Sequence, residues 1–340
     1  MPSPPVLSLQ DVAAGAPLDL DLDADGVPRR PLVVVDLDSD PVPAAGRLED
    51  ALPVVVGITR DPQSNEPAAD ACDLTLATGD GQRSPRFVPV ADVDAALAVL
   101  VAKVASAPRA AVALAALLRQ TSSLPPRDGL LAESAAYSTL LAGPDFAAWL
   151  RSRGARRPVP SGDPLRVERD GDVLRLTLAR PERRNAVTAA LRDALVDALA
   201  IAHADPSLRV EITAEGPDFS TGGDLDEFGT APDVATAHLV RSDRSVGAAL
   251  LDISDRVRVR MHGRAQGSGL EMPAFAGHIT ATPDATFELP ELALGLVPGA
   301  GGTVSVTRRI FRWRTAWLAL SGAVIDAPTA LRWGLIDAVA

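Results

Sequence analysis

Two glutamates in the second half of the chain have the surroundings best suited to catalysis. Glu271 lies in a predicted helical stretch that is otherwise apolar, Leu270 to Phe275, and Glu291 follows Pro290 after a short β-like run. Burial without a charged partner raises the pKa of a carboxyl group, and a carboxyl that titrates near neutral pH suits general acid or base catalysis. Either residue alone could equally be a solvated helix residue or a helix-start residue. The pair indicates a catalytic site only if another feature of the sequence belongs to the same site.

Glycine-rich segments accompany these glutamates, at Phe219–Leu225, Gly263–Glu271 and Gly295–Thr303. One such segment is weak evidence, because glycine commonly serves a positive φ or close backbone packing. The first two segments, however, each follow a predicted strand. Turns that end adjacent strands can direct their free N–H groups at one point and hold a developing oxyanion, as the enolate chemistry of a thioester requires. The segments and the glutamates together favour a catalytic role for Glu271 and Glu291 over these structural ones.

The elements that would position these residues alternate between strand and helix. The sequence predicts a hairpin of Leu165–Arg169 and Val173–Leu178, and a helix from Thr188 to His203 with Thr188 as its N-cap. Further strands are predicted at Arg209–Thr213 and Arg256–Met261. Such alternation is typical of an α/β fold. We therefore assign residues 165–340 to an α/β catalytic core.

Residues 1–157 form a separate α/β region in the same prediction. Two β-branched runs, Pro31–Asp36 and Leu52–Thr59, are typical of strands buried on both faces. Helices are expected over Val93–Leu118 with a break at Pro108, and then at Leu130–Leu141 and Pro144–Arg153. A joint rich in proline and arginine, Arg156 to Pro164, separates this region from the core.

Composition excludes several classes of function. The net charge of −11 is unsuited to binding nucleic acid, which needs extensive clustered positive charge. Cys72 is the only cysteine and the four histidines show no metal-ligand spacing, so we expect no disulfide and no metal site. The N-terminal residues lack the pattern of a signal peptide, and no apolar run has the ~20 residues of a membrane span. These features predict a cytoplasmic protein with no membrane partner.

The motifs from Arg180 to Val339 resemble, in order and spacing, those of the crotonase (enoyl-CoA hydratase/isomerase) superfamily. Arg180-Pro-Glu-Arg-Arg-Asn-Ala186 resembles the family's early RP…NA turn, whose backbone contacts CoA, and Phe219–Leu225 resembles its F-x-x-G-x-D-L motif. Leu320-Ser-Gly and the closing Ala330–Ala338 fit later helices of the family. The resemblance implies a ββα-repeat spiral fold for residues 165–340 and a homo-oligomer, a trimer or a hexamer.

The resemblance also implies a role for particular residues. The backbone N–H groups of Gly223 and Ser268 would form the oxyanion hole, Glu271 and Glu291 would be catalytic, and Gly299 would position the reacting water. Ser268 stands where the family usually has glycine, which leaves the backbone donor in place and adds a hydroxyl. CoA would be part of the substrate, with no separate cofactor or metal. The CoA-binding positions carried over are Arg183, Arg184, Ala186, Thr221, Asp224 and Leu225.

The expected activity is that of an enoyl-CoA hydratase, a lyase that adds water across the Cα–Cβ bond of an acyl-CoA thioester or removes it. Two alternatives remain open on the same fold: a double-bond isomerase or thioester hydrolase, and a weakly catalytic scaffold subunit. The two matched glutamates favour the hydratase, whereas Ser268 and the unusual first half motivate the scaffold.

The arrangement of the two halves is unusual for the family. Its members normally continue beyond the equivalent of Ala340 with helices that cover the acyl pocket, and a similar helical pattern here precedes the core, in residues 108–157. We favour the interpretation that the first half is a degenerate crotonase-like unit that ends in these tail helices. They would then cover the site of the core, with Phe146 and Trp149 packed on the pocket. The alternative is an unrelated α/β domain whose helices resemble the tail by chance.

Overall fold

The computed structural model describes residues 4–39, 45–61, 66–79, 84–158 and 162–340. Residues 1–3 of the N-terminal segment and residues 159–161 of the predicted joint lie outside the described residues. The chain is mixed α/β throughout, as predicted.

The first half is built on a parallel sheet whose strands follow the order of the chain. The two strands predicted from β-branched runs are confirmed, and their residues are largely buried on both faces. Alternate side chains face opposite sides, so that Val33 and Val35 join one buried cluster and Val34 joins another. The strands are β1 (Val6–Ser8), β2 (Leu32–Asp36), β3 (Val54–Thr59), β4 (Leu74–Thr78) and β5 (Phe87–Val90).

Helices pack on both faces of this sheet. Three short ones share a buried cluster with one face: α1 (Leu9–Ala13), α2 (Ala45–Glu49) and α3 (Glu66–Ala71). Four longer ones follow: α4 (Val93–Ser106), α5 (Pro108–Thr121), α6 (Pro126–Leu141) and α7 (Pro144–Ser152). The predicted break at Pro108 is confirmed, because a proline ring fits the first turn of a helix and not its interior. No single described helix is long and apolar enough to cross a membrane, although α4 and α5, bent by 109°, meet that test as a pair.

The second half contains two sheets. The larger has the order β14-β11-β9-β8-β7-β6, in which β6 and β7 form the predicted antiparallel hairpin and the other neighbours are parallel. Its strands are β6 (Leu165–Asp170), β7 (Val173–Leu178), β8 (Arg209–Ala214), β9 (Val257–Met261), β11 (His278–Ala281) and β14 (Ala338–Val339). The smaller sheet contains β10 (Arg264–Gln266), β12 (Thr286–Glu288) and β13 (Ile325–Asp326).

The helices of the second half include the predicted α8 (Ala189–Ala204), which is capped by Thr188. The helical stretch expected over Leu270–Phe275 is shorter than predicted: α11 spans only Ser268–Glu271, and a 3-10 turn at Pro273–Phe275 follows. Pro273 has no N–H to continue an α-helical ladder, which accounts for the change. The others are α9 (Val234–Asp243), α10 (Val246–Asp252), α12 (Gly302–Ser321) and α13 (Ala327–Trp333), with 3-10 turns at Pro181–Arg183, Ser254–Arg256 and Glu291–Leu294.

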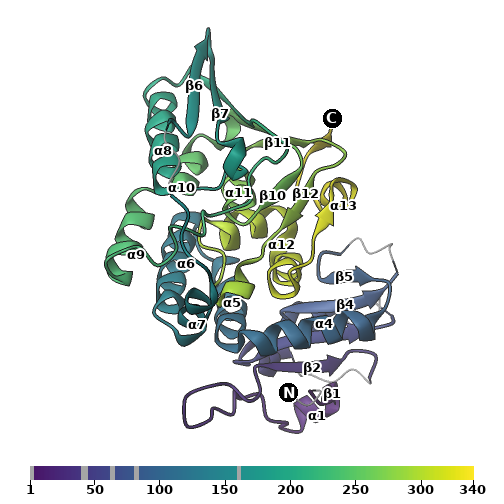
Figure 1. The fold of residues 1–340 in the computed structure, drawn as a ribbon. Coiled ribbons are helices and arrows are strands. Elements are labelled where there is room, and N and C mark those ends of the chain that lie inside the picture. The colour runs from purple at the N-terminus through teal and green to yellow at the C-terminus, as the bar shows by residue number, and fades with distance from the viewer. Residues whose placement is uncertain (1–3, 40–44, 62–65, 80–83, 159–161) are drawn as a thin grey trace.

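The two halves share one hydrophobic core. Helix α12 packs on α4, α5 and α6 and on the last two strands of the N-terminal sheet, β4 and β5, so this sheet contacts the core through α12. Helices α5, α6 and α7 lie between the N-terminal sheet and the larger C-terminal sheet, and α6 also contacts α9 (Figure 1). The helices predicted to resemble a tail therefore lie beside the glycine-rich segments of the core.

Candidate active site

Backbone hydrogen bonds bring the first two glycine-rich segments side by side. Phe219 donates its N–H to His262 O (2.9 Å), and Ser220 donates to Arg264 O (3.0 Å). Gln266 N–H returns a bond to Ser220 O (3.0 Å). These bonds extend the contact beyond the ends of β8 and β9, as turns following adjacent strands should.

Close packing accounts for glycine at two of these positions. A Cβ at Gly269 would lie 2.6 Å from both Ser220 Cβ and Ser220 O, and one at Gly222, whose φ is +86°, would lie 2.9 Å from Gln266 O. The close approach puts Gly223 and Ser268 in the wall of one cavity. Neither backbone N–H donates a hydrogen bond to any described residue, so both are available to a ligand.

The cavity has a volume of about 920 Å³ and its wall comes from both halves of the chain. It contains every residue that the sequence placed at the reacting centre: Gly223, Ser268, Glu271, Glu291 and Gly299. Helices α6 and α7 supply much of the opposite wall, and α9 and α10 close one side. Phe146 lines the cavity as predicted, whereas Trp149 lies outside its lining and stacks on Phe146, with ring centroids 5.5 Å apart.

Glu271 is buried and held by backbone donors. Its Oε2 accepts hydrogen bonds from the N–H of Ala300 (2.7 Å) and of Gly302 (2.9 Å), at the start of α12. Burial raises the pKa of Glu271 to about 7, although these backbone hydrogen bonds oppose the shift. A carboxyl titrating near neutral pH can act as a base.

Glu291 is buried with fewer partners than Glu271. Its Oε2 has no hydrogen-bond partner among the described residues, and neither has the hydroxyl of Ser268, which lines the same cavity. Burial, together with repulsion from Glu271, raises the pKa of Glu291 well above its ordinary value. Two neighbouring buried carboxyls in different hydrogen-bond surroundings are the arrangement expected of an acid and base pair.

A third glutamate, which the sequence analysis did not place at the site, comes from the first half of the chain. Glu133 on α6 accepts hydrogen bonds from Gly301 N–H (2.6 Å), Thr303 N–H (2.8 Å) and the Thr303 hydroxyl (2.7 Å). Burial and repulsion from Glu271 raise the pKa of Glu133 to about 8. The one available signal was its place in the tail-like helical segment, residues 108–157.

Glu133 and Glu271 therefore hold alternate residues of a single loop. Glu271 binds the amides of Ala300 and Gly302, and Glu133 binds those of Gly301 and Thr303. This loop leads into α12 and forms the wall of the cavity beside Gly299. The first half of the chain thus contributes directly to the geometry around Glu271.

Tyr137, one turn after Glu133 on α6, covers Gly299. A Cβ at Gly299 would overlap the Tyr137 ring, so only glycine fits beneath it. Burial, opposed by Arg241 but reinforced by the three glutamates, raises the pKa of Tyr137 and keeps its hydroxyl neutral. The hydroxyl donates to no described residue, and Tyr137 lines the cavity.

The predicted CoA-binding residues are less uniform in their surroundings. Asp224 is buried and lines the cavity, whereas Leu225 and Arg184 are exposed, and Ala186 and Thr221 are half-buried outside its lining. The backbone of Arg184 contacts that of Thr221, because the Arg184 carbonyl oxygen accepts the Thr221 N–H (3.1 Å).

The Arg183 guanidinium is already paired. Its Nη2 lies 3.5 Å from Asp224 Oδ2 and 3.3 Å from Asp226 Oδ2, and it donates to Pro158 O (3.2 Å). A phosphate contact by this side chain would have to compete with two carboxylates, so the backbone at this turn is the more accessible group.

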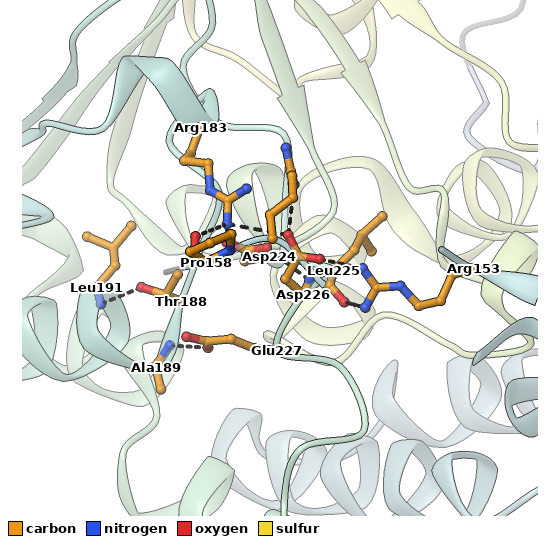
Figure 2. Close-up of polar contacts among 11 residues, drawn as sticks. Arg153, Pro158, Arg183, Thr188, Ala189, Leu191, Asp224, Leu225, Asp226 and Glu227 are labelled. Atoms are coloured by element: carbon orange, nitrogen blue, oxygen red, sulfur yellow. Dashed lines mark hydrogen bonds and ion pairs between the residues drawn. The ribbon is translucent and has the colours of Figure 1, made fainter. Parts of the chain in front are cut away.

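Asp226 ties the joint between the two halves to the first glycine-rich segment. Figure 2 shows Arg153 and Arg183 approaching it from opposite sides. Arg153 Nη2 lies 2.6 Å and Arg157 Nε 2.9 Å from its carboxylate. Burial opposes ionisation, but the hydrogen bonds from Arg157 and Arg153 outweigh it and lower the pKa of Asp226 to about 2. The next residue, Glu227, accepts the Ala189 N–H (2.6 Å) at the start of α8.

No group of three or more His, Cys, Asp or Glu side chains suited to a metal ion occurs among the described residues. The arrangement instead combines two free backbone donors with buried carboxyls of raised pKa. Such a site can polarise a carbonyl and transfer protons beside it.

Comparison with known proteins matches this part of the chain. A family model described as enoyl-CoA hydratase/isomerase matches residues 168–340. A 2,3-dehydroadipyl-CoA hydratase from Escherichia coli (strain K12) is 36% identical over 176 residues, 52% of this chain and 68% of the relative. A cyclohexa-1,5-dienecarbonyl-CoA hydratase from Thauera aromatica is 38% identical over 183 residues, 53% of this chain and 69% of the relative. Among solved structures, an enoyl-CoA hydratase from Thermoplasma volcanium GSS1 aligns with 53% of this chain and 72% of its own, at 30% identity and a TM-score of 0.49.

Proposed function

The chain belongs to the enoyl-CoA hydratase/isomerase family and is an enzyme of that family, and on this premise we propose that it hydrates the Cα–Cβ double bond of an enoyl-CoA thioester. The observation that carries the proposal is the meeting of Glu271 and Glu291 with the free N–H groups of Gly223 and Ser268 in one cavity. The hydratase names of two relatives support the choice of reaction.

The thioester carbonyl oxygen accepts hydrogen bonds from the N–H groups of Gly223 and Ser268. These donors are fixed in place by the packing of the two glycine-rich segments, so little reorganisation is needed as negative charge develops on the oxygen. Loss of one such donor typically costs about 10²–10³-fold in kcat.

The two glutamates transfer the protons. Ionised Glu271 takes a proton from water as the water oxygen bonds to Cβ, and protonated Glu291 delivers its proton to Cα as the enolate collapses. The assignment follows the surroundings of the two carboxyls: two backbone N–H donors favour the ionised form of Glu271, whereas Glu291 Oε2 has no donor and repulsion from Glu271 favours the protonated form of Glu291. One water is consumed, and a proton passes from Glu271 back to Glu291 or through solvent to restore the starting state.

CoA is part of the substrate, and the reaction uses no separate cofactor or metal. The backbone of the Arg183–Ala186 turn is the proposed contact for CoA, since the Arg183 side chain is paired with aspartates. We also propose that α6 and α7 serve as the covering helices that family members place after the core. Their contribution of Glu133, Tyr137 and Phe146 to the cavity supports this.

The test is turnover of crotonyl-CoA and longer enoyl-CoA thioesters, followed by the loss of the conjugated enoyl-thioester absorbance in the ultraviolet. Glu271→Gln and Glu291→Gln are measured beside the parent chain, with circular dichroism to confirm folding. We expect hydration by the parent and its loss in both variants. Binding of enoyl-CoA without hydration would contradict the proposal; a shifted double bond would identify an isomerase, and released CoA a hydrolase.

A further inference from the structure

Arg241 brings a positive charge to the wall of the acyl cavity. It lies near the end of α9, half-buried, with its guanidinium 4.7 Å from the centre of the Tyr137 ring. Its hydrogen-bond acceptors are neutral oxygens on α6. Nε donates to Ser134 Oγ (3.3 Å), and Nη2 donates to Ser134 O (3.3 Å) and to Ser138 Oγ.

Arg241 differs from the other arginines of this cavity. Those three pair with aspartates: Arg127 with Asp252 (2.5 Å), Arg192 with Asp193 (2.8 Å), and Arg244 with Asp193 (3.2 Å) and Asp197 (2.6 Å). No carboxylate of the described residues lies within 4.0 Å of Arg241. A partly desolvated cation without a counter-ion is unfavourable, and burial lowers the pKa of Arg241 accordingly.

The acidic groups close enough to act on the charge of Arg241 are Tyr137 and Glu133; Tyr137 is neutral, and Glu133 cannot fully neutralise the guanidinium. Both Glu133 oxygens are already bound by Gly301 and Thr303. With a pKa raised to about 8 by burial and by Glu271, Glu133 is largely protonated at neutral pH. The cation on the cavity wall is therefore left without an ionised partner.

Two donors beside this cation remain free. The Nη1 group of Arg241 makes no hydrogen bond with any described residue, because its bonds to α6 use Nε and Nη2. The second donor is the hydroxyl of Tyr137, a residue that lines the same cavity; this hydroxyl is neutral because the pKa of Tyr137 is raised. A guanidinium edge is well matched to a carboxylate, which accepts from a planar fork of N–H donors.

We propose that Arg241, assisted by Tyr137, binds a carboxylate carried by the acyl group beyond Cβ, so that the substrates are CoA thioesters of unsaturated dicarboxylic acids. The inference rests on the proposed hydratase function and names its substrate class. Tyr137 covers Gly299 beside Glu271, so the proposed carboxylate site adjoins the reacting centre.

The test compares three enoyl-CoA thioesters of equal chain length that end in a carboxylate, a carboxamide or a methyl group. The parent chain should show a kcat/KM for the carboxylate about tenfold or more above that for the carboxamide, since a hydrogen bond to a charged group is worth about 1.5–3 kcal/mol. Arg241→Gln should reduce kcat/KM for the carboxylate by about 10- to 100-fold and change it little for the methyl-terminated substrate.

Arg244→Gln is the matched control, because Arg244 lines the same cavity but is paired with two aspartates. Its ratio of carboxylate to carboxamide turnover should equal that of the parent. A parent chain without carboxylate preference would overturn the proposal. So would an equal loss by Arg241→Gln on all three substrates, which would assign Arg241 to CoA binding or to the packing of α9.

Failure of the hydratase function would be seen separately, as absence of turnover with all three thioesters. In that case the dissociation constants of the three thioesters are measured by calorimetry on the parent, Arg241→Gln and Arg244→Gln. The affinity for the carboxylate is then compared with that for the carboxamide and the methyl-terminated thioester. A preference for the carboxylate that only Arg241→Gln abolishes would support the binding site without the reaction, and its absence would refute both.

Discussion

Replacement of Glu133 by alanine is expected to weaken both the fold and the reacting centre. The change leaves three buried donors without an acceptor: the N–H of Gly301 and the N–H and hydroxyl of Thr303. A buried donor that loses its partner costs about 1–3 kcal/mol. We take the lower value for each because water can enter from the cavity, and expect the free energy of unfolding to fall by about 3 kcal/mol. Glu133→Gln keeps one acceptor oxygen, so its free energy of unfolding should fall by less, about 1–2 kcal/mol.

The same variants should leave the pH dependence of hydration nearly unchanged. Glu271 and Glu133 repel each other when both are ionised, and this repulsion contributes to the raised pKa of Glu133. Glu271, with a pKa of about 7, ionises while Glu133 is still largely protonated, so loss of the Glu133 carboxyl should not lower the pKa of Glu271. The rise of kcat/KM with pH, which tracks ionisation of the Glu271 base, should therefore stay at the same pH in both variants.

Urea unfolding followed by circular dichroism gives the stabilities, and kcat/KM between pH 5 and pH 9 gives the ionisation. Asp128→Ala is the control, since Asp128 is an exposed acid in the first turn of the same helix. It should change stability by no more than about 1 kcal/mol. If Glu133→Ala is as stable as Asp128→Ala, the three hydrogen bonds carry no net stability. A rise of kcat/KM that moves to lower pH in these variants would show that Glu133 is ionised before Glu271, and would refute this order of ionisation.

Three further outcomes are expected. Gly299→Ala should lower hydration by more than tenfold because its Cβ overlaps the Tyr137 ring, and Tyr137→Ala in the same chain should restore part of the loss, measured as kcat. The free energy of unfolding should fall as pH rises from about 4.5 to about 8, because the raised pKa values of Glu133 and Glu271 keep protons bound in the folded state that the unfolded state releases. Urea unfolding at several pH values should show this free energy falling by up to ~1.4 kcal/mol per pH unit for each group. Asp226→Ala removes the ion-pair partner of Arg157 in the joint and of Arg153 just before it, so limited trypsin digestion should cut after these arginines faster than in the parent; an unchanged rate would refute the role of Asp226 as the anchor.

Local patterns predicted the elements well. The β-branched runs of β2 and β3, the alternation of β6 and β7 and the N-cap Thr188 each express a preference of the backbone or of a buried face, which neighbouring residues alone decide. The stretch after Ser268 was mistaken for one helix because its apolar residues suggested continuity, whereas Pro273 interrupts it. The CoA-contact roles remain predictions, with the Arg183 side chain paired to aspartates that lie far from it in sequence.

Motif spacing by itself determined which residues of the core meet, because the segments around Gly223, Ser268, Glu271 and Glu291 each follow a strand of a sheet, and strand pairing brings them into one cavity. Only the tertiary structure decided that Glu133 and Arg241 belong to the same cavity. Glu133 binds a loop 168 residues away, and no local preference specifies a contact at that separation. The surroundings of Glu133, and with them its raised pKa, exist only after α6 has packed on α12, because burial and the nearness of Glu271 are properties of the packed state.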